Sequence, residues 1–226
     1  MLLSMTPTIH VKECLSFGWT TFKSRPWFFV QASAILVGIS IVIGVVEDFI
    51  KMVSSELVMN IVTTVESTIT NTLFSIGTTA LFLTAHRNAH EASFSQLWNP
   101  TPFWRYLGIT FIGGFLTILG LILFIVPGII IAIAFSFSGI LVVEEGMGPI
   151  AALKESARLT RGHRMQLFKL GLASAGINIL GALALLVGLF VTVPATTLAF
   201  VHAYRAITGK ESGEELVMVP EEAVTA

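Results

Sequence analysis

Long uncharged runs of hydrophobic residues dominate the sequence and alternate with short polar segments. One crossing of the hydrocarbon core of a bilayer takes about 20 residues of helix. The runs 27–46 and 67–85 are each long enough for one crossing, whereas the runs 106–143 and 170–204 are long enough for two. The pattern therefore predicts an all-α, polytopic membrane bundle of six transmembrane helices. Their expected bounds are about 27–46, 67–86, 104–125, 128–144, 166–187 and 189–206.

A fold-back is expected near the middle of each long run. Pro127 and Gly128 interrupt the first run, because proline removes a helix donor and glycine accepts the dihedral angles of a tight reversal. Gly188 has the corresponding position in the second run. The segments 119–127 and 186–194 share a rhythm, which indicates either a repeated hairpin or a chance likeness between apolar, glycine-rich segments.

Two amphipathic helices are predicted outside these spans, at 7–23 and 149–161. Thr6-Pro7 is typical of a helix start, and Pro149 and Gly162 bound the second helix. The apolar faces hold Val11, Cys14, Leu15, Gly18, Trp19 and Phe22 in the first helix, and Ile150, Leu153 and Ala157 in the second. The first helix either lies among lipid headgroups or packs against the cytoplasmic ends of the bundle.

The composition agrees with a membrane protein. Hydrophobic residues make up 54% of the chain and charged residues 12%, against about 25% charged in soluble domains. The net charge of -1 and the lack of a recognition motif argue against nucleic acid as a partner. The single cysteine, Cys14, excludes an internal disulfide. We expect no removable signal peptide, and we expect the acidic segment 209–226 to be a disordered cytoplasmic tail.

The basic residues predict the orientation. With six spans, 12 of the 13 lysines and arginines lie on one side, and only Lys51 lies on the other. Because positive charge concentrates in cytoplasmic loops, both termini are expected in the cytoplasm. The basic residues on that side are Lys12, Lys23, Arg25, Arg87, Arg105, Lys154, Arg158, Arg161, Arg164, Lys169, Arg205 and Lys210.

A stripe of polar residues follows one face of the second predicted span. Its members are Ser67, Thr70, Asn71, Ser75 and Thr78, and it extends backward through Asn60, Thr63 and Thr64. In lipid such a face must point at protein or water, so it indicates either helix packing or a path for a solute. Ser174, Asn178 and His202 are further polar residues within predicted spans, where interhelical hydrogen bonding is the expected role.

Three polar clusters are candidates for chemistry. His86 and His90 lie four residues apart and would share a helix face, so that with Glu91 they are weak candidates for a metal site, although no third ligand is placed by the sequence. Glu144 and Glu145 would point about 100 degrees apart on a helix, so they are expected to be solvated ends of a span rather than one site. Lys154, Arg158, Arg161 and Arg164 are candidates for contact with lipid headgroups or a partner.

Four short motifs accompany the first long run and the helix after it. They are Ile125-Val126-Pro127-Gly128, Val142-Val143-Glu144-Glu145-Gly146, Pro149-Ile150-Ala151-Ala152-Leu153-Lys154-Glu155-Ser156 and Leu159-Thr160-Arg161-Gly162. In this combination they resemble the membrane-domain family that accompanies some bacterial glycerophosphodiester phosphodiesterases, and the YciC-like group of stand-alone integral membrane proteins. The resemblance implies a six-helix bundle in a prokaryotic plasma membrane. It implies no activity, because the family's hydrolase is a separate soluble domain.

Three functions are open on the sequence alone. The first is a non-enzymatic scaffold or regulator that engages lipid headgroups or protein partners, because no nucleophile-base set, phosphate loop or dense ligand cluster is found. The alternative is a small-solute or lipid permease with a polar path along the second span. An intramembrane enzyme that uses Glu144 or the pair His86 and His90 is the third. We expect no cofactor, and we expect as partners the bilayer and either another protein or a second copy of the chain.

Overall fold

The computed structural model describes residues 10–51, 56–184 and 187–210, and every regular element in these residues is helical. The elements are α1 (Val11–Ser24), α2 (Pro26–Lys51), α3 (Glu56–Arg87), the 3-10 helix η1 (Phe94–Leu97), α4 (Phe103–Leu123), α5 (Ile125–Ala134), α6 (Ser138–Glu144), α7 (Pro149–Leu159), α8 (Arg164–Leu183) and α9 (Leu189–Thr208). The predicted start at Thr6-Pro7 and most of the predicted tail lie outside the described residues.

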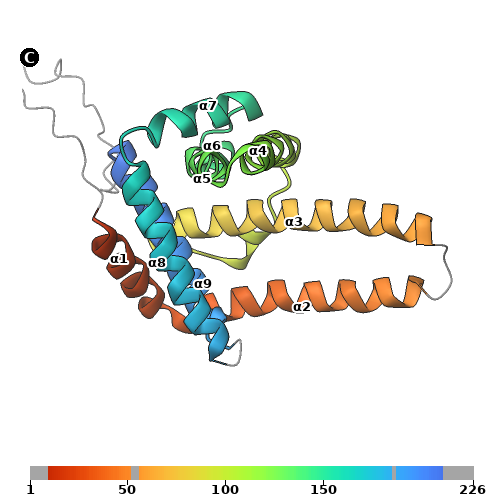
Figure 1. The fold of residues 1–226 in the computed structure, drawn as a ribbon. Coiled ribbons are helices and arrows are strands. Elements are labelled where there is room, and N and C mark those ends of the chain that lie inside the picture. The colour runs from red at the N-terminus through yellow and green to blue at the C-terminus, as the bar shows by residue number, and fades with distance from the viewer. Residues whose placement is uncertain (1–9, 52–55, 185–186, 211–226) are drawn as a thin grey trace, which may run out of the picture.

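Three helical hairpins meet at a shared base (Figure 1). They are α2–α3, α4–α5 with its continuation α6, and α8–α9. The hairpins are not parallel: where α2 and α3 run across the view and extend beyond the other helices, α4 and α5 are seen nearly end-on. Helix α9 is central to the base, because it packs against α1, α2, α3 and α8.

Four helical segments are long and apolar enough to cross a membrane, judged by length and composition. They are Pro26–Asp48, Phe103–Leu123, Ile125–Glu144 and Arg164–Leu183. The all-helical membrane architecture is thus confirmed for the described residues, but the count of six spans is not. Helices α3 and α9 are also long, yet the hydroxyl and amide side chains of α3, and His202 and Arg205 in α9, lower their hydropathy.

The polar residues that precede the predicted second span belong to the same helix as that span. Helix α3 begins at Glu56 and continues for 32 residues to Arg87, well beyond the predicted span 67–86. The hydroxyl groups of Thr64, Thr68 and Thr72 donate to the carbonyl oxygen four residues earlier at 2.6 to 2.7 Å. Each hydroxyl is thereby satisfied within its own helix.

The reversal of the first long run lies at Phe124, three residues before the predicted position. Phe124 is extended, with φ -161° and ψ 147°, and separates α4 from α5. Pro127 lies in the first turn of α5, where a helix needs no backbone donor. Gly128 allows close packing, because a Cβ atom there would overlap the side chain of Leu121 on α4. Both residues shape the hairpin, but neither makes the turn.

A second break was not predicted. The expected helix 128–144 is interrupted at 135–137, so that α5 and α6 are separate helices. The three residues of the break are Phe135, Ser136 and Phe137, which continue the apolar pattern and give no sequence signal of a stop.

Large hydrophobic side chains cover the outer faces of the hairpins. Exposed residues include Ile41, Val42, Val45 and Val46 on α2, Phe111, Phe115, Ile118 and Ile122 on α4, and Leu172, Ile179, Leu180 and Leu183 on α8. Such continuous apolar surface is rare on soluble monomers and is the surface that hydrocarbon chains solvate. The hairpins therefore present lipid-facing surfaces.

The two amphipathic helices pack against protein. On α1 the buried residues are Cys14, Gly18 and Phe22, and the helix lies along α9. On α7 the buried residues are Ala152, Leu153 and Ser156, whereas Ile150 is 60% exposed. The predicted apolar face of α7 is therefore rotated, because Ser156 must reach the break between α5 and α6.

Replacing Gly18 by alanine should destabilise the base. A Cβ atom at Gly18 would overlap the backbone carbonyl oxygen of Ala195 on α9, and backbone cannot rotate away as a side chain can. Overpacking of this kind costs about 1 to 3 kcal/mol. Thermal unfolding in detergent should show a lowered midpoint for Gly18→Ala. The matched control is Gly38→Ala, where an added Cβ meets nothing within 4 Å; an equal drop in both variants would refute the close contact.

Candidate functional site

A cluster of charged side chains joins three helices at the base. The Glu144 carboxylate at the end of α6 contacts Arg205 of α9 at 2.6 Å and Arg87 of α3 at 3.1 Å. The side chains of Glu144 and Arg205 are only 10% and 4% exposed, whereas that of Arg87 is 60% exposed. The expectation that Glu144 is a solvated end is therefore wrong: it is a buried charge with a buried partner and a second, outer partner.

Glu145 belongs to a different set of contacts. Its carboxylate accepts hydrogen bonds from the Tyr204 hydroxyl at 3.2 Å and from the Lys210 ammonium at 2.9 Å. Adjacent residues on a helix diverge by about 100 degrees, and the two carboxylates accordingly contact different groups. Tyr204 is fully buried, so this contact also fixes α9 against the end of α6.

A pair of histidines with a phenylalanine beside them connects the same helices to α1. The ring nitrogens of His86 on α3 and His202 on α9 are 3.1 Å apart. The Phe17 ring of α1 stacks on His202 with a centroid distance of 4.3 Å and lies 4.5 Å from His86. Burial lowers the pKa of His86 from 6.5 to about 4, and the nearby His202, Arg205 and Arg87 act in the same direction. Both effects favour the neutral imidazole.

The predicted metal candidates do not share a helix face. Helix α3 ends at Arg87, so His90 and Glu91 lie in the following turn, and their partner there is Asn88. Within the described residues, no group of three or more His, Cys, Asp and Glu side chains is arranged to hold a metal ion.

The break between α5 and α6 is stabilised by a serine of α7. The Ser156 hydroxyl accepts the backbone N–H of Phe137 at 3.1 Å and donates to the carbonyl oxygen of Ala134 at 2.7 Å. Both contacts are buried. One side chain therefore replaces two backbone hydrogen bonds that the interrupted helix has lost, which is necessary where water is scarce.

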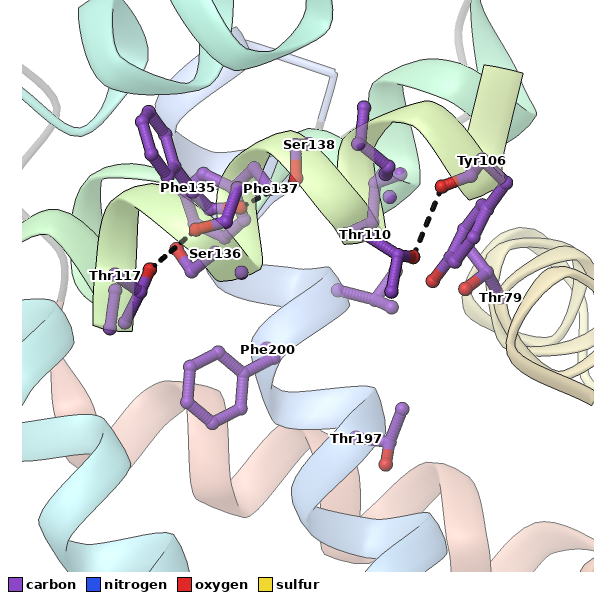
Figure 2. A pocket seen from close by; sticks show the side chains of 17 residues that line it. Thr79, Tyr106, Thr110, Thr117, Phe135, Ser136, Phe137, Ser138, Thr197 and Phe200 are labelled. Carbon is purple, nitrogen blue, oxygen red and sulfur yellow. Dashed lines mark hydrogen bonds between the residues drawn. The ribbon is translucent and has the colours of Figure 1, made fainter. Parts of the chain in front are cut away.

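A pocket of about 520 Å³ lies beside this break, between the α4–α5 hairpin, α3 and α9 (Figure 2). Hydroxyl groups supply its polar lining, and no charged side chain contributes to it. The hydroxyl-bearing residues are Thr79, Tyr106, Thr110, Thr117, Ser136, Ser138 and Thr197. Most of these were not singled out in the sequence, because they are scattered over four helices.

The polar stripe of α3 is divided among different surroundings. Thr78 lines a separate, apolar pocket with residues of α2 and α9, whereas the neighbouring Thr79 reaches the hydroxyl-lined pocket. Asn71 is exposed and donates to the carbonyl oxygen of Ser67 at 2.8 Å. Thr70 donates to the Glu66 carboxylate at 2.6 Å, and Ser75 accepts Thr79 through its backbone carbonyl. The stripe lines no single path through the described residues.

Polar residues of the last hairpin contact each other. The Asn178 amide of α8 donates to the Thr196 hydroxyl of α9 at 3.3 Å, and Ser174 is buried one turn earlier. Asn178 thus makes an interhelical hydrogen bond, whereas the buried Ser174 hydroxyl has no hydrogen-bond partner among the described residues.

The basic residues after the break differ in their partners. Arg158 donates to both oxygens of Glu155, at 2.8 Å from its Nε atom, and this contact lowers the pKa of the Glu155 carboxyl. Lys154 and Arg161 are exposed, and Arg164 is partly buried. These last three make no ion pair with the described residues.

Comparisons with known proteins place this chain in a family. The model of the family described as "Uncharacterised protein family (UPF0259)" matches residues 56–170, which are just over half of the chain. The chain belongs to UPF0259. The matched stretch begins with α3, includes the α4–α5 hairpin and α7, and ends in the first part of α8. It therefore contains Glu144, most of the pocket and the basic residues of α7.

Curated UPF0259 relatives are bacterial membrane proteins. A "UPF0259 membrane protein" of Yersinia pestis (strain Pestoides F) and one of Yersinia pseudotuberculosis (serotype O:1b, strain IP 31758) are each 53% identical over 55 residues. That stretch is 24% of this chain and 22% of each relative, so the match spans about a fifth of the length of these relatives. No solved structure matches. The prediction of a bacterial membrane protein is therefore confirmed. The family description and these names contain no reference to a phosphodiesterase or to the YciC-like group.

Several contacts of the UPF0259 chain could not be found from the sequence. Arg25, counted only as a cytoplasmic charge, donates to the backbone carbonyl oxygens of Ala89, His90 and Ala92 at 2.9 to 3.2 Å. Arg205, counted in the same way, is buried with Glu144. The charge pattern predicts a side of the membrane for these residues but not their partners.

Replacing Ser156 by alanine should weaken the link between α7 and the α5–α6 break. The change leaves a buried N–H and a buried carbonyl without their partner, and each such group costs about 1 to 3 kcal/mol. We expect a lower thermal midpoint for Ser156→Ala in detergent, with Ser16→Ala on the exposed face of α1 as the control. Equal midpoints for both variants and the parent protein would count against the bridge.

Acid should destabilise the base through His86. Because the folded-state pKa of about 4 is below the unfolded value of 6.5, the unfolded chain binds the proton more readily in that interval. Stability should therefore fall as the pH falls from about 6.5 towards 4. Unfolding midpoints measured across this range should depend less on pH in His86→Gln. The variant His90→Gln, altered at an exposed turn residue, should keep the parent slope; a parent slope in His86→Gln would contradict the assignment.

Proposed function

We propose that this protein is a non-enzymatic membrane protein that holds anionic lipid headgroups at the end of α7 and the start of α8. The observation that carries the proposal is the division of the basic residues. Arg87 and Arg205 are paired with Glu144, Lys210 with Glu145, and Arg158 with Glu155. Lys154, Arg161 and Arg164 lack such partners among the described residues, so their charge is available to an external anion.

The geometry around these three cations supports a lipid as the anion. Helix α7 lies over the α4–α6 part of the fold (Figure 1) and packs against α4, which exposes large hydrophobic side chains on another face. The Nε atom of Arg164 is buried and has no hydrogen-bond partner among the described residues. Basic residues near a membrane surface each contribute about 1 kcal/mol to the attraction of anionic lipid. A lipid headgroup would neutralise this charge where the chain enters the membrane.

The proposal also includes an orientation in the membrane, which rests on the distribution of the basic residues. The base would face the cytoplasm of a prokaryotic plasma membrane, with both termini on that side, because this places 12 of the 13 basic residues there. A scaffold or regulatory role would use the same surface for a protein partner or a second copy of the chain. The resemblance to the membrane domain of glycerophosphodiester phosphodiesterases stays a prediction.

Neutralising the three cations should weaken the retention of anionic lipid. We expect the triple variant Lys154→Gln/Arg161→Gln/Arg164→Gln to bind phosphatidylglycerol about 150-fold less tightly, at about 1 kcal/mol for each of the three charges. Native mass spectrometry of the purified protein with phosphatidylglycerol, and with phosphatidylcholine as neutral comparison, measures this directly.

The matched control for that experiment is Arg158→Gln on the same helix. Because Glu155 already neutralises Arg158, its loss should change lipid retention little. Added salt should weaken phosphatidylglycerol binding to the parent protein and have less effect on the triple variant. Equal losses in the triple variant and the control, or no loss in either, would overturn the proposal.

A permease is the second candidate, and the interrupted helix favours it. Discontinuous helices whose free backbone groups border a cavity are typical of substrate sites in transporters. Here the break at 135–137 borders the hydroxyl-lined pocket, and Ser136 is exposed there. The path would run by Thr79, Thr110 and Thr197 rather than along the whole stripe of α3.

Uptake by reconstituted protein tests the permease. Proteoliposomes exposed to a gradient of a small polyol such as glycerol should re-swell faster than empty vesicles. The rate should fall in Thr110→Val/Thr197→Val and stay at the parent value in Asn71→Leu, which changes the stripe outside the pocket. Rates equal to those of empty vesicles would remove the support for transport of such solutes.

A further inference from the structure

The hydroxyl-lined pocket has an unusual hydrogen-bonding character. Five of its hydroxyl groups already donate their hydrogen to a backbone carbonyl oxygen of their own or the adjoining helical segment, at 2.6 to 3.1 Å. They belong to Thr79, Thr110, Thr117, Ser138 and Thr197. A hydroxyl carries a single hydrogen, so these oxygens offer only lone pairs to a ligand. Five of the seven hydroxyl groups in the pocket wall are therefore acceptors that need donors from the ligand, whereas the hydroxyl groups of Tyr106 and Ser136 make no such bond to a carbonyl oxygen of the described residues.

The pocket selects against charged ligands. None of its lining residues is charged, and the carboxylates of α6 are paired with Arg87, Arg205 and Lys210 outside it. An anion would meet five hydroxyl oxygens whose hydrogens are already donated, and no positive charge. A cation would find acceptors but no carboxylate, and burying an unpaired charge is costly. A neutral group that donates hydrogen bonds, such as an alcohol, fits the lining.

The remaining walls are apolar and the pocket is not closed. Ile109, Phe200 and Val201 contribute hydrocarbon surface, while Thr110 and Ser136 are exposed. Phe111, next in sequence to Thr110, lies on the exposed face of α4 that we assign to lipid. A molecule can therefore reach the hydroxyl groups from the hydrocarbon phase. Its polar end must be an alcohol, and the rest of it can be apolar.

We propose that this pocket binds the head of an uncharged lipid alcohol of the acylglycerol type, whose hydroxyl groups donate to the threonine and serine oxygens. The inference deepens the second candidate function by naming a ligand class, but it requires binding only and not transport. It is also independent of the anionic headgroup site, since the cations of that site do not line the pocket.

Three photoactivatable probes with the same acyl chain distinguish the chemistry of the head. A monoacylglycerol, a fatty acid and an alkylamine, each with a diazirine on the chain, are added to the purified full-length protein in detergent free of anionic lipid. The monoacylglycerol should label α4 and α9 in preference to the other two. Equal labelling by all three probes, or preference for the fatty acid, would overturn the proposal.

Isosteric variants test the acceptor wall. In Thr110→Val/Thr197→Val the shape stays and two acceptor oxygens are lost, so monoacylglycerol labelling should need a concentration about fivefold higher for each lost hydrogen bond. The control is Thr68→Val on α3, which loses an equivalent bond to its own helix, to the Thr64 carbonyl at 2.7 Å, away from the pocket. A similar change in the control and the double variant would refute the assignment.

A blocking variant keeps the test valid if the threonine variants fold poorly. Gly114 lines the pocket, and an added Cβ meets nothing within 4 Å, so Gly114→Leu fills the space without a backbone clash. It should abolish monoacylglycerol labelling while phosphatidylglycerol retention stays at the parent level. Gly176→Leu on α8, another open glycine, is its control and should label normally. Undiminished labelling of Gly114→Leu would contradict binding in this pocket.

Discussion

The burial of the Glu144 carboxylate is the constraint on which the base depends. An ionised carboxylate removed from water is tolerated only with a close partner, and Arg205 supplies that partner at 2.6 Å. Since Glu144 ends α6 and Arg205 lies near the end of α9, satisfying one charge fixes the relative position of two hairpins. Arg87 adds the end of the third hairpin from the outer side.

The neighbouring contacts extend this constraint to the rest of the base. Glu145, the residue after α6, contacts Tyr204 in the last turns of α9 and Lys210 just beyond α9. The histidines of α3 and α9 lie against Phe17, which brings α1 to the same place. The hairpins can diverge in Figure 1 because their connection at the base does not require them to pack along their whole length.

Away from the base, backbone and hydroxyl groups with little access to water are hydrogen-bonded within the protein. In α3 the threonine hydroxyl groups donate to carbonyl oxygens of their own helix, so they need no partner on another helix. At the α5–α6 break, Ser156 supplies both a donor and an acceptor to the interrupted backbone. Five hydroxyl groups of the pocket likewise donate to backbone carbonyl oxygens and keep acceptor capacity only, which is the basis of the ligand class that we propose.

Much of this fold could be predicted from local pattern, and the failures share a cause. The uncharged runs predicted the hairpins, Pro149 predicted the start of α7, and Gly162 predicted the turn after it. The positions that pattern could not give depend on residues distant in sequence. Glu144 was expected to be solvated because Arg205 is far along the chain, and the break at 135–137 was missed because Ser156 stabilises it from another helix. His90 was placed on a helix that ends at Arg87, where polar residues continue without a stop signal.

A double-mutant cycle between Glu144 and Arg205 tests the central claim most directly. The free energy of unfolding in mixed micelles would be measured for the parent protein, Glu144→Gln, Arg205→Met and the double variant. Removing one partner of a buried pair costs about 3 to 5 kcal/mol, so the double variant should lose much less than the sum of the single losses, with a coupling of at least about 1.5 kcal/mol. Additive losses, with a coupling near zero, would show that the carboxylate does not depend on the arginine and would contradict the account.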